Sequence, residues 1–158
     1  MEGIVMATIK TESAVSMNAP DRRDGTLQVA WGHYTYADEG AVAIGDVIQM
    51  CKLPAGARIV DIMVEWGALT SGTFDVGDGD NDDRFLAAIA MDNAGRMSLF
   101  GGLANGAEID EATNVSGMGY TYDAADTLDI TIEGAAISAT LAITLCVLYT
   151  VEGGFDDE

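Results

Sequence analysis

The chain has 158 residues, of which 49% are hydrophobic and 7% aromatic, and its formal charge at pH 7 is −19. This length and apolar content suffice for one domain with a buried core that needs neither disulfides nor a metal. The electrostatic field of such a negative chain repels phosphate backbones and anionic lipid headgroups. We therefore expect no direct binding to nucleic acid or to a membrane surface.

Residues 1–25 differ from the rest of the chain because they show no regular alternation of apolar and polar side chains. Three basic residues, Lys10, Arg22 and Arg23, stand against four acids, so this segment carries a charge of −1 and leaves −18 on the other 133 residues. We predict an extended N-terminal arm that contacts a partner protein, and a frayed terminus is the alternative. The segment lacks the basic stretch and long apolar run of a secretory signal.

From residue 26 onward, apolar residues recur at every second position, which is the period of a β-strand with one buried face. In residues 126–134, for example, Leu128, Ile130 and Ile132 alternate with polar residues. The pattern predicts strands over residues 26–36, 45–53, 58–66, 72–77, 84–91, 117–123, 126–134 and 140–151, separated by turns rich in glycine and aspartate. For residues 82–95 an amphipathic helix is the competing interpretation.

Two of the predicted strands have a second face of mixed character. In residues 58–66 the even-numbered positions form one apolar face, whereas Ile59 and Met63 share the other face with Asp61 and Glu65. In the last strand Leu148 lies among threonines on the less apolar face. We therefore interpret Ile59, Met63 and Leu148 as candidates for contact with other subunits, and packing in the core is the alternative.

These elements predict an all-β protein, most simply a jelly-roll-like β-sandwich of two sheets with an extended N-terminal arm. The expected organisation is the arm over residues 1–25, the β-sandwich domain over residues 26–152 and an acidic C-terminal tail over residues 153–158. The closing strand is long and rich in β-branched residues, so we expect it to lie inside a sheet and not at its edge.

Few residues of the chain suit catalysis. Its one histidine, His33, lies in an alternating segment, so neither a multi-histidine metal centre nor a serine–histidine–aspartate triad is indicated. Cys51 and Cys146 lie far apart and outside any CxxC pair, so we expect reduced thiols in the core. There is no phosphate-binding loop or hydrolase motif, and we predict a protein that is not an enzyme and has no cofactor.

The segment DVGDGDNDDRF, residues 75–85, is the best candidate for a metal site. Asp78, Asp80 and Asp82 match the first three ligand positions of an EF-hand loop, but the required glycine and glutamate are missing at the sixth and twelfth positions. We therefore favour a tight turn in which Gly77 and Gly79 adopt positive φ and the aspartates face solvent. A calcium site at the three aspartates is the weaker alternative.

The segment CKLPAGARIVDIMVEWGALTSGTFDVGDGDNDDRFLAA, residues 51–88, and the closing strand LAITLCVLYTVEG resemble small virion structural proteins of tailed bacteriophages. In that group a strand ends in an L-P-x-G turn, a long strand follows, and a glycine–aspartate turn leads into a D-R-F-L-A segment. The resemblance covers residues 26–152. It implies a capsid decoration (cement) protein, a homotrimer on the outer surface of the virion head whose partner is the major capsid protein and whose arm contacts that capsid.

Two other functions remain open. The first is a tail or head-fibre-base module of a phage virion. The second is a calcium-dependent carbohydrate-binding β-sandwich, in which Trp31, Tyr34 and Tyr36 would form the site together with the 75–83 loop.

Overall fold

The computed structural model of the chain describes residues 7–11, 26–99, 102–103, 117 and 119–151. In chain order the strands are β1 (Thr8–Lys10), β2 (Gln28–Thr35), β3 (Val47–Leu53), β4 (Ala57–Trp66), β5 (Thr73–Gly77), β6 (Leu86–Ala90), β7 (Gly95–Ser98), β8 (Gly102–Leu103), β9 (Asp126–Glu133) and β10 (Ala142–Val151). A short helix, α2 (Tyr36–Glu39), lies between β2 and β3. The part of the chain that the structure describes contains no helix with the length and hydrophobicity needed to cross a membrane.

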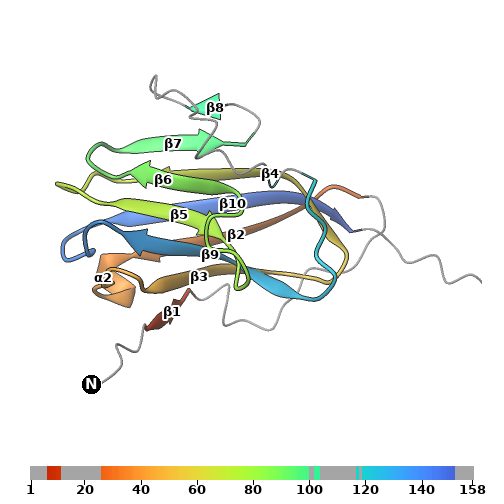
Figure 1. Ribbon diagram of the computed structural model, residues 1–158, viewed down its shortest axis with the longest axis horizontal. Helices are drawn as coiled ribbons and strands as arrows, with labels where there is room; N and C mark the ends of the chain where they lie inside the picture. Colours follow the sequence, from red (N-terminus) through yellow and green to blue (C-terminus); the bar gives the residue numbers. More distant parts are fainter. Residues whose placement is uncertain (1–6, 12–25, 100–101, 104–116, 118, 152–158) are drawn as a thin grey trace, which may run out of the picture.

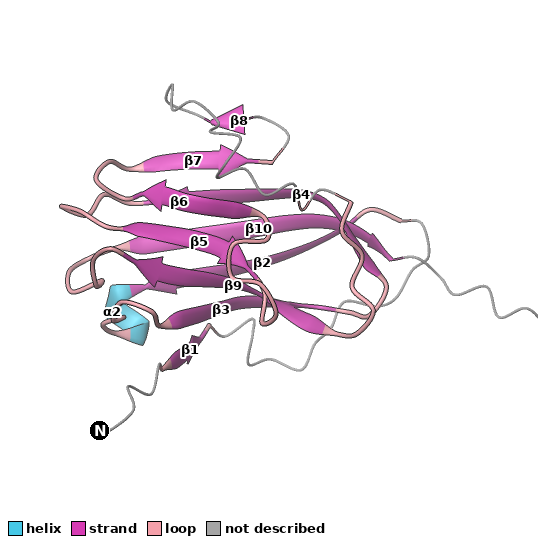
Figure 2. Cartoon of the chain, in the orientation of Figure 1, coloured by secondary structure: helices cyan, strands magenta, loops and turns pink. Residues whose placement is uncertain are grey.

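The strands form two five-stranded sheets packed face to face, with sheet A in front of sheet B in Figure 1. Sheet A has the strand order β1-β3-β9-β5-β6, and sheet B has the order β2-β10-β4-β7-β8. Strands account for most of the cartoon in Figure 2. The predicted all-β sandwich of two sheets is confirmed.

The core lies between the two sheets because the inward faces of the central strands are apolar. Leu128, Ile130 and Ile132 of β9 have no exposed surface, and the inward side chains of β10 are equally buried. β10 pairs with β2 on one side and with β4 on the other, so its predicted place inside a sheet is confirmed. Removal of these alternating apolar faces from water holds the two layers together.

The predicted facing of Ile59 is wrong, because a β-bulge shifts the alternation of β4. In the ladder between β4 and β10, Leu148 pairs with Asp61 and Tyr149 pairs with Ile59, so Val60 is the extra residue. An extra residue reverses the facing of the side chains that precede it. Ile59 therefore packs in the core, where it is 1% exposed, and has almost no surface to offer another subunit.

In residues 117–123, which we predicted as a strand, an isolated bridge joins Thr121 to Arg58 of β4, and backbone hydrogen bonds join the segment to Ala57 and Ile59, but no regular strand forms among the described residues. Gly119 has a φ of +81°, and the amide of Tyr120 donates a hydrogen bond to the carbonyl of Gly117. The turn made by these two glycines interrupts a continuous ladder. Residues 82–95 contain strand β6, so the helix that we considered for this segment is wrong.

The helix α2 was not predicted, although its start carries a recognisable signal. The hydroxyl of Thr35 accepts a hydrogen bond from the amide of Asp38 (3.2 Å), and the carboxylate of Glu39 accepts one from the amide of Thr35 (2.8 Å). This reciprocal pair resembles a capping box. Gly40, with a φ of +84°, ends the helix after one turn.

Part of the predicted arm joins the sandwich. β1 pairs in parallel with β3 at one edge of sheet A, Ile9 packs against the core, and the hydroxyl of Thr11 donates to the carbonyl of Met50 (2.6 Å). Lys10 is exposed in this strand. Arg22 and Arg23 and the predicted tail over residues 153–158 lie outside the described residues.

Candidate functional site

The outer face of sheet B, which points away from the core, carries an apolar patch. Cross-strand pairing sets Trp31, Cys146 and Met63 side by side across β2, β10 and β4, and sets Val29 beside Leu148 in the neighbouring row. Trp31 is 59% exposed, Val29 54% and Met63 40%, whereas Cys146 and Leu148 are half-buried. We call these five residues the sheet B patch.

Polar residues of both signs border the sheet B patch. On one side of it lie Arg58 and Asp61 of β4. On the other side lies Glu65, which faces Arg96 in the ladder between β4 and β7. The hydroxyl of Ser98 donates to the carboxylate of Asp61 (2.9 Å to Oδ2). Two arginines thus offset two carboxylates, so this face is locally close to neutral although the whole chain carries −19.

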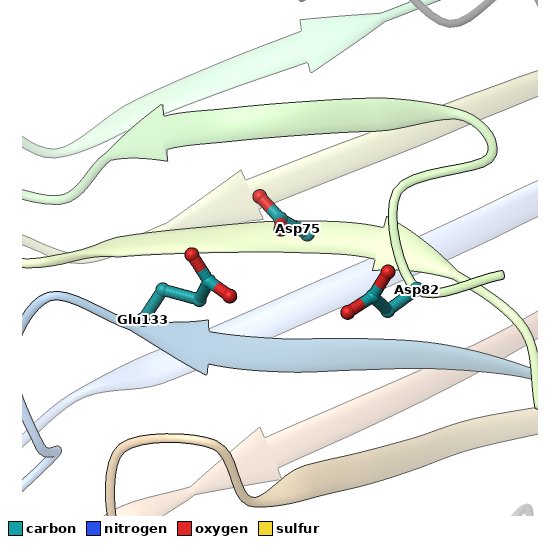
Figure 3. A group of neighbouring side chains, drawn as sticks. All are labelled: Asp75, Asp82 and Glu133. Atoms are coloured by element: carbon teal, nitrogen blue, oxygen red, sulfur yellow. The ribbon is translucent and has the colours of Figure 1, made fainter.

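The outer face of sheet A is acidic. Three carboxylates meet there: Asp75 of β5, Asp82 of the loop between β5 and β6, and Glu133 of β9. One carboxylate oxygen of each lies within 4.8 Å of the other two, and Figure 3 shows the three side chains on the same face. Asp75 is 8% exposed, and its Oδ1 accepts a hydrogen bond from the amide of Ala88 (2.6 Å). Burial, reinforced by repulsion from the other two carboxylates, raises the pKa of Asp75. Three carboxylates are the kind of ligand set that Ca²⁺ or Mg²⁺ prefers.

The predicted calcium ligands Asp78, Asp80 and Asp82 do not converge on one point, because Asp78 is used inside the protein. Its side chain accepts hydrogen bonds from Arg84 Nε (2.5 Å) and Tyr122 Oη (3.1 Å), and Asp78 is 4% exposed. Its Oδ1 also accepts hydrogen bonds from the backbone amides of Asp80 and Asn81, and these bonds close the turn. The tight turn is therefore confirmed, but the expectation that the aspartates of residues 75–85 face solvent is wrong for Asp75 and Asp78, which are buried.

The two glycines of this turn act differently from our prediction. Neither Gly77 nor Gly79 has a positive φ. A Cβ on Gly77 would instead lie 2.1 Å from the carbonyl oxygen of Asn81, so glycine is needed for the close approach of the loop to the outer face of sheet A. Sequence reasoning also missed Glu133, because only the pairing of β5 with β9 brings it beside Asp75.

Asp129 is a second buried carboxyl on the outer face of sheet A, where it pairs with Gln49 on one side and with Gly77 on the other. It is 3% exposed, and its Oδ1 has no hydrogen-bond partner among the described residues. Burial raises its pKa to about 7, helped by repulsion from Asp126 and Asp78 and opposed by a hydrogen bond from the side chain of Thr127 and by the charge of Lys10. This carboxyl therefore changes charge near neutral pH.

The carbohydrate site that we considered is not assembled. Trp31 lies on the outer face of sheet B, whereas the 75–83 loop covers the outer face of sheet A. Tyr34 is wholly buried and its hydroxyl donates to the carbonyl of Gly40 (2.6 Å). Tyr36 is half-buried at the start of α2. The three aromatic residues therefore share no face with the carboxylates of the loop, and the prediction of this combined site is wrong.

The remaining candidates lie on or near sheet B. His33 is exposed, with its Nδ1 2.8 Å from the hydroxyl oxygen of Thr144. Cys51 and Cys146 are free thiols, as predicted, but only Cys51 lies in the core, and the predicted core position is wrong for Cys146. Burial raises the pKa of Cys51 to about 12. Of the three candidates for subunit contact, Met63 and Leu148 belong to the sheet B patch and Ile59 is in the core.

The chain is similar in structure to chains of three phage capsids. A chain of the capsid of Ralstonia phage GP4 matches with a TM-score of 0.65 and 17% identity over 94% of this chain and 99% of that chain. A chain of the cyanophage Pam1 capsid asymmetric unit matches with a TM-score of 0.60 and 19% identity over 86% and 93%. A chain of the acidic stable capsid of Helicobacter pylori bacteriophage KHP30 matches with a TM-score of 0.51 and 20% identity over 84% and 94%. No protein-family model matches this chain, and no curated protein matches it. The sandwich is thus a fold found in phage capsids.

Proposed function

We propose that this protein is a capsid decoration (cement) protein of a tailed bacteriophage, which binds the outer surface of the head and stabilises contacts between capsid subunits. The observation that carries the proposal is the nearly end-to-end match with chains of phage capsids, which reaches 94% of this chain and 99% of the Ralstonia phage GP4 chain. The match therefore extends over nearly the whole length of both chains. The resemblance in sequence described above points to the same class of protein.

The division of the surface supports a decoration role over that of a shell-forming subunit. A protein that sits on a finished shell needs one adhesive face and one face that stays in water. The sheet B patch supplies exposed apolar side chains on one side, and carboxylates occupy the outer face of sheet A on the other. Large exposed apolar patches on soluble domains mark sites of interaction.

The partner in this proposal is the major capsid protein, and the protein is a structural component without enzymatic activity. The homotrimer that the resemblance implies would assemble on the head, because a charge of −19 on each chain opposes association of free molecules. Repeated contacts by several copies would then bind much more tightly than one copy alone.

The arm belongs to the proposal as a second point of attachment. Its basic residues Lys10, Arg22 and Arg23 are our candidates for contact with the capsid. Because residues 7–11 are part of the sandwich, removal of the whole arm would also disturb the fold. The double substitution Arg22→Ala/Arg23→Ala is the cleaner variant: we expect weaker attachment to heads and an unchanged thermal melting curve.

Gradient co-sedimentation tests the proposed function. Purified protein is mixed with empty heads assembled without it and, in parallel, with isolated tails of the same phage. We expect saturable binding to heads and none to tails. Binding to tails alone would favour the tail or head-fibre-base module, and binding to neither particle would show that the proposal is wrong.

A further inference from the structure

We infer that the sheet B patch is the surface by which this protein docks on a different capsid subunit, and that the docking site is a flat apolar surface of neutral or positive potential. This inference rests on the proposed function and adds to it the face, the orientation and the chemistry of the partner.

The shape and composition of the patch suit burial against a protein. Val29, Trp31, Met63, Cys146 and Leu148 come from three neighbouring strands of sheet B, so they form one continuous area and not scattered exposed residues. Trp31, at 59% exposed, is the largest side chain of the patch. Tryptophan is among the residues that contribute most to binding when they are buried at the centre of an interface.

The charges around the patch identify the kind of partner. Arg58 and Arg96 offset Asp61 and Glu65 at its border, so a partner meets no uncompensated charge there. Beyond the border the chain is strongly acidic, with −19 in total. A high net charge keeps copies of one protein apart, whereas it attracts a partner of positive potential and speeds their encounter. The charges therefore favour a different protein over a second copy.

The same arrangement determines the orientation on the head. When the sheet B patch faces the shell, the outer face of sheet A points away from it, and so do Asp75, Asp82 and Glu133. Lys10 lies opposite Gln49 in the ladder between β1 and β3, next to Asp129 on this outward face. The inference therefore removes Lys10 from the three candidates for contact with the capsid and keeps Arg22 and Arg23. The acidic face then stays hydrated and repels the acidic faces of other particles.

Cys146 offers a native reporter for this interface. It lies between Trp31 and Met63 and is half-buried, whereas Cys51 is 2% exposed and shielded from reagents. The rate at which iodoacetamide alkylates the Cys146 thiol, measured by mass spectrometry, therefore reports whether the sheet B patch is covered. We expect the rate at Cys146 to fall several-fold when the wild-type protein is bound to empty heads.

A pair of matched substitutions completes the experiment. Trp31→Ser removes the largest side chain of the patch, and Ile44→Ser removes a side chain of nearly equal exposure (58%) that lies outside it. Because both side chains are exposed, both variants should keep the wild-type melting temperature. We expect Trp31→Ser to weaken binding to heads about tenfold or more, and Ile44→Ser to bind as the wild type does.

The outcomes separate the inference from the proposed function. If the wild type co-sediments with heads while Cys146 stays reactive and Trp31→Ser binds normally, the inference is wrong and the proposed function stands. If Cys146 becomes protected in the free protein at high concentration, a second copy occupies the patch and the inference is wrong. If the wild type does not bind heads, both are wrong.

Discussion

At the scale of single residues, the acidic side chains of this protein divide into those that the fold uses and those that it only exposes. Asp78 is enclosed by Arg84, Tyr122 and two backbone amides, and the guanidinium of Arg84 lies 4.0 Å from the centre of the Tyr120 ring. Asp80, two residues away, is exposed. The same residue type in the same turn therefore has two different roles.

The substitution Asp78→Asn should lower the free energy of unfolding by about 2–3 kcal/mol, because it removes the charge that pairs with Arg84 and leaves the guanidinium uncompensated. Urea denaturation followed by circular dichroism measures this change. Asp80→Asn is the matched control and should change the value by less than about 0.5 kcal/mol. Equal stability of the two variants would contradict the role we assign to Asp78.

Asp129 should make stability depend on pH. In the folded protein its pKa is raised to about 7, whereas its ordinary value is 3.8. Between these values the folded state holds a proton that the unfolded chain has released, so the contribution of this group to stability falls as the pH rises from about 4 to about 7.

The variant Asp129→Asn isolates this effect. We expect it to match the wild type at about pH 3.5, where this carboxyl is protonated in the folded and in the unfolded chain, and to exceed it by about 1–3 kcal/mol at about pH 8.5, where the wild type buries a carboxylate with an unpaired oxygen. Urea denaturation at both pH values measures the difference, and Asp123→Asn, at an exposed position, serves as control. A wild-type advantage at the higher pH would refute the assignment.

At the scale of the elements, one glycine controls how closely two strands of different sheets approach. A Cβ on Gly32 of β2 would lie 2.1 Å from the carbonyl oxygen of Met50 in β3 and 2.6 Å from its carbonyl carbon. These are backbone atoms and cannot turn aside as the end of a side chain can. The two sheets therefore meet along β2 and β3 only because position 32 has no side chain.

Gly32→Ala should lower the free energy of unfolding by about 3 kcal/mol, because the strands must separate to admit one methyl group. Gly79→Ala is the control, since the nearest atom to its Cβ would be an oxygen of Asp126 at 3.7 Å, and we expect a change below about 1 kcal/mol. Thermal and urea denaturation of both variants measure the contrast. A stable Gly32→Ala protein would show that β2 and β3 do not touch in this way.

At the scale of the whole molecule, the charge of −19 is the property that affects every step of folding and assembly. Like charges repel one another in the compact state, and dissolved salt screens that repulsion over about 10 Å at 0.1 M. The melting temperature should therefore rise as sodium chloride is added to a solution of low ionic strength. Differential scanning calorimetry measures the slope.

A variant with fewer acids provides the control for this prediction. The triple substitution Asp80→Asn/Asp82→Asn/Asp83→Asn removes three carboxylates from the loop between β5 and β6 and should reduce the dependence of the melting temperature on salt. An unchanged slope would mean that the salt acts through hydrophobic burial and not through screening. A melting temperature that falls as salt is added would contradict the prediction altogether.

The class of the fold and the faces of its central strands, β9 and β10, could be predicted from the amino-acid sequence. Strand alternation is a local property, so β9 and β10 could be placed, with their buried residues, from the residues of each strand alone. The turn over residues 78–83 was predictable for the same reason. The exposed position of Met63 also follows from the alternation in β4, whereas that of Trp31 does not, because Leu27, Val29 and Trp31 form the more apolar face of their segment and are nevertheless exposed.

Which residues from distant strands meet could not be predicted before the strands were paired in three dimensions. The bulge at Val60 depends on how β4 pairs with β10, and this pairing places Ile59 in the core. The grouping of Asp75 with Glu133 depends likewise on the register of β5 against β9. Register is set by cross-strand hydrogen bonds and by packing between sheets, which no single strand encodes. For that reason the sheet B patch and the acidic face became visible as opposite sides of one molecule only in three dimensions.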